Sequence, residues 1–167
     1  MEHDAIAVLD RYRVMTVATL RPDGWPQATM VGYANQGLRL FFVVSRRSQK
    51  LSNVSRDERV SIAIGSDTRD PWAIEGLSMS ARARVLQRAE DWDHGYALLR
   101  SRHPEFAALP KLNPESAAVI EARPELITIL NYKKGFGHAD TIQVGVGGLV
   151  TMGPARVDDW GWLPSKP

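Results

Sequence analysis

The 167-residue sequence contains no cysteine, and this absence excludes disulfide bridges and any chemistry that depends on a thiolate. No apolar run approaches the roughly 18 residues that a membrane-spanning helix requires. The N-terminal stretch MEHDAIAVLD has acidic residues where a signal peptide would carry its basic region. We therefore expect a cytoplasmic protein with no membrane partner.

A large excess of one charge is also missing. The 21 basic and 19 acidic residues leave a net charge of +2, so no field over the whole surface attracts nucleic acid. The chain also lacks a row of aromatic residues on which bases could stack. We expect no nucleic-acid partner, and a barrel that binds nucleic acid through Arg46, Arg47, Arg82 and Arg84 is the weakest alternative. Any basic function must be local.

Metal-binding and nucleotide-binding motifs are missing too. His3, His94 and His103 are scattered without the spacing of metal ligands, so we expect no bound metal. The glycines of GVGG, at residues 145–148, do not follow a strand into a helix as a phosphate-binding loop requires. A nucleotide-hydrolysing enzyme therefore has no support in the sequence.

What the sequence does contain is mainly β. Runs of β-branched and alternating residues, separated by turns such as RPDG and NQG, predict strands at 14–20, 27–33, 38–44, 59–64, 77–86 and 126–132. Apolar spacing and capping residues predict helices at 1–13, 48–56 and 90–102, and a further helix with Asn113 as its N-cap and Pro114 in its first position. The glycine-rich remainder predicts a loop with at most one weak strand.

These elements predict one domain over residues 1–167, because the chain is long enough for a single core and no linker or repeat divides it. The fold class is mainly β with inserted helices (α+β). Six strands with short connections predict an antiparallel barrel, since closure removes the exposed edges of such a sheet.

Three cations stand where the third predicted strand ends, in the stretch SRRSQK. Arg46 and Arg47 precede the helix that Ser48 would cap, and Lys50 lies in its first turn. Cations at this end oppose the helix dipole, which disfavours each by about 0.3–1 kcal/mol. A phosphate bound by free backbone amides, hydroxyls and these side chains would account for the arrangement. A solvated surface cluster is the simpler alternative on charge alone.

The stretches TVATLRPDGWPQATMVGY and SRRSQKLSNVSRDERVSIAI resemble the pyridoxamine 5'-phosphate oxidase-like, FMN-binding split-barrel family. That family combines a basic Ser-x-Lys loop, a helix with an asparagine, and an acidic-Arg-Val start to the next strand. The matching positions here are Ser48, Lys50, Asn53, Asp57, Arg59 and Val60. The resemblance covers the first 65 residues well and residues 77–86 more loosely.

This resemblance implies a six-stranded antiparallel split barrel of Greek-key type that forms a homodimer with FMN at the subunit interface. It implies a phosphate site made by Lys50 and Ser48 with Arg46 or Arg47, and further contacts from Val44 and Ser45. Thr29, Met30 and Val31 would line the flavin ring, largely through their backbone.

The sequence also departs from the family's name-giving enzymes. It ends VDDWGWLPSKP without their basic C-terminal motif, and Gly76 and Leu77 stand where they have a glutamine, which argues against pyridoxamine phosphate as the substrate. The hypothesis is a flavin-dependent oxidoreductase of unknown small-molecule substrate, with no catalytic residue assigned. The alternatives are a non-catalytic flavin- or haem-binding stress or sensor protein, and a deazaflavin-dependent reductase.

A few other residues are weaker candidates. His138 and Asp140 could supply a proton donor and its orienting partner, or could simply form a solvated turn. Trp72 could cover the flavin from the partner subunit, but a hydrophobic plug is the simpler interpretation. We expect Trp160 and Trp162 to pack on the barrel or on the partner.

Overall fold

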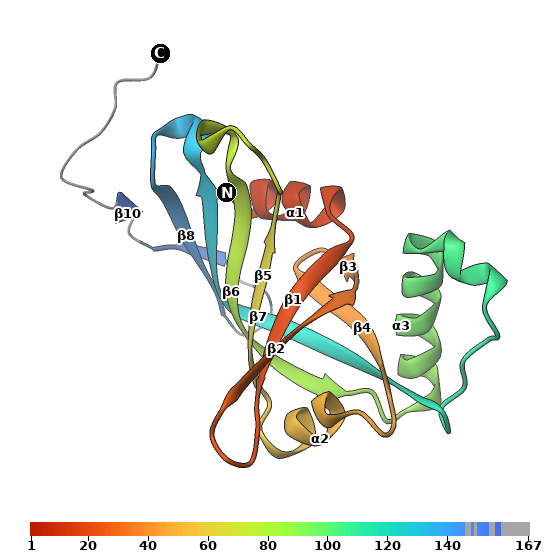
Figure 1. Ribbon diagram of the computed structural model, residues 1–167. Coiled ribbons are helices and arrows are strands. Elements are labelled where there is room, and N and C mark those ends of the chain that lie inside the picture. The colour runs from red at the N-terminus through yellow and green to blue at the C-terminus, as the bar shows by residue number, and fades with distance from the viewer. Residues whose placement is uncertain (146–147, 149, 154–155, 158–167) are drawn as a thin grey trace.

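The computed structural model describes residues 1–145, 148, 150–153 and 156–157, and Figure 1 shows their arrangement. In chain order the described elements are α1 (Glu2–Arg11), β1 (Val14–Leu20), β2 (Pro26–Gly32), β3 (Ala34–Gln36), β4 (Arg39–Ser45), α2 (Gln49–Arg56), β5 (Arg59–Gly65), η1 (Pro71–Ala73), β6 (Glu75–Val85), α3 (Ala89–Arg102), η2 (Pro104–Ala108), β7 (Ala117–Asn131), η3 (Tyr132–Lys134), β8 (His138–Val144), β9 (Val150–Met152) and β10 (Arg156–Val157), where η marks a short 3-10 helix. The strands form one strongly twisted antiparallel sheet, which confirms the predicted α+β split barrel.

The N-terminal half follows the sequence prediction closely. Strand β1 has the predicted bounds, and the turn after it places Gly24 at φ +85°, a conformation that glycine adopts without strain. Helix α2 begins after Ser48, whose hydroxyl accepts a hydrogen bond from the Leu51 amide at 3.2 Å. The predicted cap is therefore confirmed, and with it the position of the cation cluster.

The helix predicted from Asn113 is wrong. Asn113 does accept hydrogen bonds from the amides of Glu115 and Ser116, but this turn leads directly into the 15-residue strand β7. The first half of β7 pairs with β4 on one edge and β6 on the other, and its first six residues are buried on both faces. A strand buried on both faces has a continuous apolar run, which resembles a buried helix in sequence.

The number of strands is also larger than the predicted six, because the described residues form ten. The length of β7 explains part of the difference: its first half pairs with β4, and its second half pairs on the same side with β8. The short strands β9 and β10 then add to β8, and β3 forms a hairpin with β4. The glycine-rich region predicted as a loop thus contributes a full strand at residues 138–144.

Two apolar clusters hold the sheet in this shape. The larger fills the inside of the half-barrel, where Tyr33, Phe42, Met79 and Ile127 are fully or almost fully buried. The smaller lies beneath α3, where Trp92 packs with Phe41 and Val119 and donates its indole N–H to the Ala117 carbonyl at 3.3 Å. In the part of the chain that the structure describes, no helix is both long and apolar enough to cross a membrane.

The barrel is split between β2 and β4. Among the described strands, β2 has β1 as its only pairing partner, whereas β4 pairs with β3 and β7. Strands β2 and β4 approach each other without forming a ladder, so closure by hydrogen bonds is incomplete on this side. The unpaired backbone edges of both strands, and the start of α2 that follows β4, lie at this split (Figure 1).

Gly76 and Gly65 face each other across β6 and β5 and provide a matched test of packing. A Cβ atom on Gly76 would lie 2.5 Å from the Ile64 carbonyl oxygen, whereas one on Gly65 would approach its nearest atom no closer than 3.4 Å. We expect Gly76→Ala to lower the free energy of unfolding by about 1–3 kcal/mol, since backbone atoms must move. Denaturant unfolding measures the change, and equal losses for Gly76→Ala and Gly65→Ala would contradict the register of these strands.

Candidate functional site

The stretch from Ser45 to Ser48 forms a tight turn between β4 and α2. The Ser45 hydroxyl accepts a hydrogen bond from the Arg47 amide at 3.2 Å, and the Ser48 amide donates to the Ser45 carbonyl at 3.0 Å. The Ser48 hydroxyl accepts a hydrogen bond from the Leu51 amide, as described above. The hydroxyls of Ser45 and Ser48 therefore both accept bonds from the backbone and keep their own hydrogens to donate. The turn brings the two serines and the first turn of α2 together, as the resemblance implied.

The two arginines of this turn have different surroundings. Arg46 donates from Nε to the Pro114 carbonyl at 2.8 Å, and its amide donates to the Ser116 carbonyl at 3.1 Å. These bonds attach the turn to the segment before β7. The Arg47 side chain is exposed, and within the described residues it has no hydrogen bond or ion pair. Arg47 is therefore better placed than Arg46 to reach an anion.

Lys50 lies in the first turn of α2 and is only partly exposed. Its Nζ donates to the Thr29 hydroxyl of β2 at 2.6 Å, across the split in the barrel. None of the ion pairs among the described residues involves Lys50. Burial lowers the pKa of Lys50, because removal from water disfavours the charged form. Residues with perturbed pKa values cluster at functional sites, so Lys50 is a candidate for such a site.

The other residues implied by the resemblance lie on the two strands that flank the split. Thr29 and Val31 are half-buried on the same side of β2, whereas Met30 points to the outer face with 74% of its surface exposed. Val44 is buried in the core, and its backbone pairs with Ala118 of β7, so it is not positioned to contact a ligand at the split. It lies with Ser45 beyond the part of β4 that pairs with β3.

Asn53 anchors α2 to the β1–β2 hairpin and is fully buried. Its amide nitrogen donates to the Thr19 hydroxyl at 2.9 Å and to the Gln27 side-chain oxygen at 3.3 Å. Its oxygen accepts a hydrogen bond from Gln49 at 2.9 Å. Gln27 and Gln49 also line a cleft of about 550 Å³ beside the turn at residues 21–23. The sequence analysis missed both glutamines, although the four-residue spacing of Gln49 and Asn53 on a helix was a usable signal.

His138 and Asp140 do come together, but not at this site. His138 Nε2 lies 3.1 Å from Asp140, whose other oxygen accepts from Lys134 at 2.8 Å. The Lys134 bond and then the His138 contact hold the pKa of Asp140 below its usual value against the opposing effect of burial. Strand β8, which carries the pair, lies far from α2 in Figure 1. The two residues therefore do not meet Lys50 within one chain.

Of the three candidate tryptophans, only Trp72 lies within the described residues. Trp72 packs edge-on against Phe136, with ring centroids 5.5 Å apart, and Phe136 in turn contacts Tyr132. Trp72, Tyr132 and Phe136 thus form one half-buried aromatic cluster that joins η1 to η3. Trp160 and Trp162 lie outside the described residues.

The anchoring by Asn53 generates a prediction about stability. Asn53→Ala removes the partner of the buried Thr19 hydroxyl, so we expect the free energy of unfolding to fall by about 1–3 kcal/mol. Thermal and urea denaturation measure the loss. Ser52→Ala, at the exposed neighbouring position, is the control and should change stability by less than about 0.5 kcal/mol. A neutral Asn53→Ala variant would show that this network does not hold α2.

Comparisons with known proteins relate this geometry to a family. The family model described as pyridoxamine 5'-phosphate oxidase matches residues 1–131. No curated protein matches the chain. Among solved structures, a putative pyridoxamine 5'-phosphate oxidase from Listeria innocua is 22% identical with a TM-score of 0.65, and the match covers 78% of this chain and 98% of that one.

Two further structures with the same fold carry a different description. A heme binding protein from Mycobacterium smegmatis is 24% identical with a TM-score of 0.69, covering 85% of this chain and 56% of that protein. The heme storage protein HutZ from Vibrio cholerae is 21% identical with a TM-score of 0.61, covering 72% of this chain and 87% of that one. At these identities the structures establish a shared fold. With the family model over residues 1–131, they show that the chain belongs to the pyridoxamine 5'-phosphate oxidase-like family.

Proposed function

We propose that the protein binds FMN at the split between β2 and β4 and acts as a flavin-dependent oxidoreductase on a small molecule. The observation that carries this proposal is Lys50, a partly buried ammonium that reaches Thr29 across the split and has no ion-pair partner among the described residues. A phosphate group at this position would supply the missing negative charge.

The surroundings of Lys50 suit a phosphate in three ways. The start of α2 directs backbone amides toward the turn, and its first turn contains no acidic residue. The hydroxyls of Ser45 and Ser48 retain hydrogens to donate. The exposed guanidinium of Arg47 adds a second cation beside them. This donor set fits a phosphate monoester better than it fits an uncharged ligand.

The strands beside the phosphate site suit the ring of the cofactor. Thr29 and Val31 present one side of β2 to the split, and the unpaired edge of β4 offers the backbone of Ser45. Backbone donors and acceptors can orient the flavin ring, and an apolar wall excludes water from it. When bound, FMN would supply the hydride or electron chemistry, and the protein would supply its position and field.

We also propose that the protein is a homodimer. The outer face of β2, β1 and β5 carries a row of small and apolar residues, and the charged residue of these strands on this face is Arg59 at the start of β5. The row consists of Val14, Thr16, Ala18, Ala28, Met30, Ser61 and Ala63. Met30 is 74% exposed and Val14 is 45% exposed on this face. A second copy covering it would bury the apolar surface and would shield the unpaired edge strand β2 beside the proposed FMN site.

Haem binding is the alternative that the neighbouring structures suggest, since two of them are described as heme-binding or heme-storing. Of the four histidines of this chain, His103 and His138 already have partners within the structure. His103 is buried and bonded to the Tyr33 carbonyl at 2.9 Å, and His138 contacts Asp140. The absorption spectrum of the purified protein distinguishes the two cofactors, because flavin bands support the proposal whereas a Soret band without flavin contradicts it.

The proposed phosphate site predicts the effect of losing its cation. Lys50→Ala should weaken FMN binding by about ten- to a hundredfold, since a hydrogen bond between charged groups contributes about 1.5–3 kcal/mol. Quenching of flavin fluorescence during titration measures the dissociation constant. Lys133→Ala removes an exposed lysine from η3 and is the control for a loss of one positive charge.

The same titration distinguishes the contributions of Arg46 and Arg47 to FMN binding. Arg47→Ala should weaken FMN binding more than Arg46→Ala, because Arg46 is held by the Pro114 carbonyl. Equal affinities for wild type, Lys50→Ala and Arg47→Ala would refute the phosphate site even if FMN still bound elsewhere.

The proposed dimer interface predicts the effect of a charge on the outer face. Met30→Glu should convert the dimer to a monomer, because burying a carboxylate without a partner costs several kcal/mol. Analytical ultracentrifugation measures the mass in solution. Leu109→Glu places the same charge at a residue that is 60% exposed on another part of the surface, and this variant should remain dimeric. A Met30→Glu variant that stays dimeric would place the interface elsewhere.

A further inference from the structure

Four arginines lie in one row across the outer side of the sheet. The register pairs Arg59 of β5 with Arg82 of β6, and Arg82 with Arg123 of β7. Arg39, at the start of β4, continues the row. Leu40 pairs with Ala122, so Arg39 lies opposite Arg123. Like charges at paired positions destabilise a sheet, so strand pairing alone does not account for this row.

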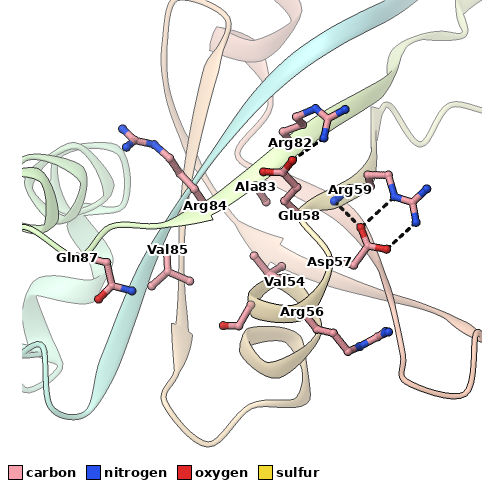
Figure 2. Close-up of a pocket in the computed structure, with 11 residues that line it drawn as sticks. Val54, Arg56, Asp57, Glu58, Arg59, Arg82, Ala83, Arg84, Val85 and Gln87 are labelled. Atoms are coloured by element: carbon pink, nitrogen blue, oxygen red, sulfur yellow. Dashed lines mark hydrogen bonds and ion pairs between the residues drawn. The ribbon is translucent and has the colours of Figure 1, made fainter.

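One end of the row is neutralised by neighbouring acids. Arg59 forms two hydrogen bonds with Asp57, of 2.9 and 2.7 Å. Arg82 bonds both Glu58, at 2.5 Å, and Glu125, at 2.6 Å. Figure 2 shows the Arg59–Asp57 and Arg82–Glu58 pairs at a cleft of about 600 Å³. The two arginines at this end therefore carry no unbalanced charge.

The other end has more positive than negative charge. Arg39, Arg84 and Arg123 all contact one carboxylate, that of Glu121, at 3.2, 2.6 and 3.1 Å respectively. Glu121 is only 1% exposed, whereas about half of each arginine side chain is exposed. Three guanidinium groups around one carboxylate leave a local excess of two positive charges.

Glu121 holds Arg84 and Arg123 in place without using their terminal nitrogens, whereas Arg39 donates from one terminal nitrogen to Glu121 and from the other to Gln36. Burial would raise the pKa of Glu121, but bonds from Arg123 and Arg84 outweigh this effect and keep the pKa below its usual value. Arg84 and Arg123 contact the carboxylate through Nε. Within the described residues, the terminal nitrogens of both side chains have no other partner. Each guanidinium therefore presents fixed, free N–H groups to solvent.

The excess charge lies between two clefts. Arg84 lines the cleft in Figure 2, where its side chain is directed away from the Arg82–Glu58 pair. Arg39 and Arg123 line a second cleft of about 780 Å³, which Arg82, Glu2 and Glu125 also line. A small ligand could thus approach the cluster from either cleft. A nucleic acid needs a longer positively charged surface along its backbone. The row does not provide one, because Arg59 and Arg82 are neutralised by acidic partners.

We propose that Arg39, Arg84 and Arg123 form a second anion site, which binds a small multivalent oxyanion carried as phosphate or as carboxylate groups. The planar forks of guanidinium match both groups, and the fixed orientation reduces the entropy lost on binding. The site is independent of the proposed FMN site, because it lies on β4, β6 and β7 and shares no residue with the cluster around Lys50.

Titration of the ¹⁵N-labelled full chain with inorganic pyrophosphate, and separately with citrate, tests this proposal by NMR. We expect saturable shifts of the Arg84 and Arg123 side-chain N–H signals with at least one of the two anions. The shifts should persist in Lys50→Ala, which removes the cation of the other site. The anion that binds more tightly identifies whether phosphate or carboxylate groups are preferred.

Substitutions then show whether the anion binds specifically to this arginine cluster or is attracted by positive charge anywhere on the surface. Arg84→Gln should weaken binding by about tenfold or more, as expected for one lost charged hydrogen bond. Because Arg84→Gln could destabilise the fold around Glu121, Arg39→Gln is a second variant with a longer contact to that carboxylate. Arg88→Gln removes an exposed arginine just before α3, away from Glu121, and is the control.

Several results would overturn the proposal. It fails if neither anion produces saturable shifts, or if Arg88→Gln weakens binding as much as Arg84→Gln and Arg39→Gln do. It also fails if the shifts occur at residues 48–51 and disappear in Lys50→Ala, because the anion then occupies the proposed FMN phosphate site. Binding of an oligonucleotide without binding of either small anion would likewise contradict it.

Discussion

The length and double pairing of β7 are the constraint on which the rest of the structure depends. This strand pairs with β6 along its length, with β4 along its first half and with β8 along its second half. Strand β4 pairs with β7, and β2 pairs with β1 alone among the described strands, so β2 and β4 meet without a ladder. The start of α2 then lies at the split, where Lys50 bridges to Thr29.

The same strand also fixes the turn that carries the cations. Arg46 donates to the Pro114 carbonyl, and its amide donates to the Ser116 carbonyl, both just before β7 begins. Asn53 ties the other side of α2 to β1 and β2. The start of α2 is thus positioned from two directions by bonds to separate strands. A site held in this way needs little reorganisation when a ligand binds.

Local signals in the sequence were sufficient for the elements whose structure is decided locally. Strand β1 and helix α2 were predicted with nearly the observed bounds, because turn residues and the Ser48 cap mark their ends. The start of β7 could not be predicted in this way. The run AAVIEA, at residues 117–122, is a strand because β4 and β6 lie on its two sides and α3 covers one face, and these partners are distant in sequence.

In the candidate site, too, the features decided locally could be predicted, and those that depend on distant residues could not. The conflict of Arg46, Arg47 and Lys50 with the helix dipole was visible in the sequence and located the cluster correctly on the chain. That Arg46 is held by the Pro114 carbonyl, whereas Lys50 has no carboxylate, was not visible, since both depend on residues far along the chain. The arginine row was hidden for the same reason, because only strand register brings its members together.

The two cation clusters differ in how the protein compensates their charge, and this difference bears on what each can do. Among the described residues, the hydrogen-bond partner of Lys50 is the Thr29 hydroxyl and no carboxylate pairs with it, so an anionic ligand could supply its counter-charge. Glu121 compensates one of three arginines and stabilises their geometry. A buried ion pair is often no more stabilising than apolar residues of similar volume, so stability alone does not account for a buried carboxylate surrounded by three exposed guanidiniums. Orientation of those guanidiniums toward an external anion does account for it, because one fixed carboxylate aligns all three and leaves two positive charges unbalanced.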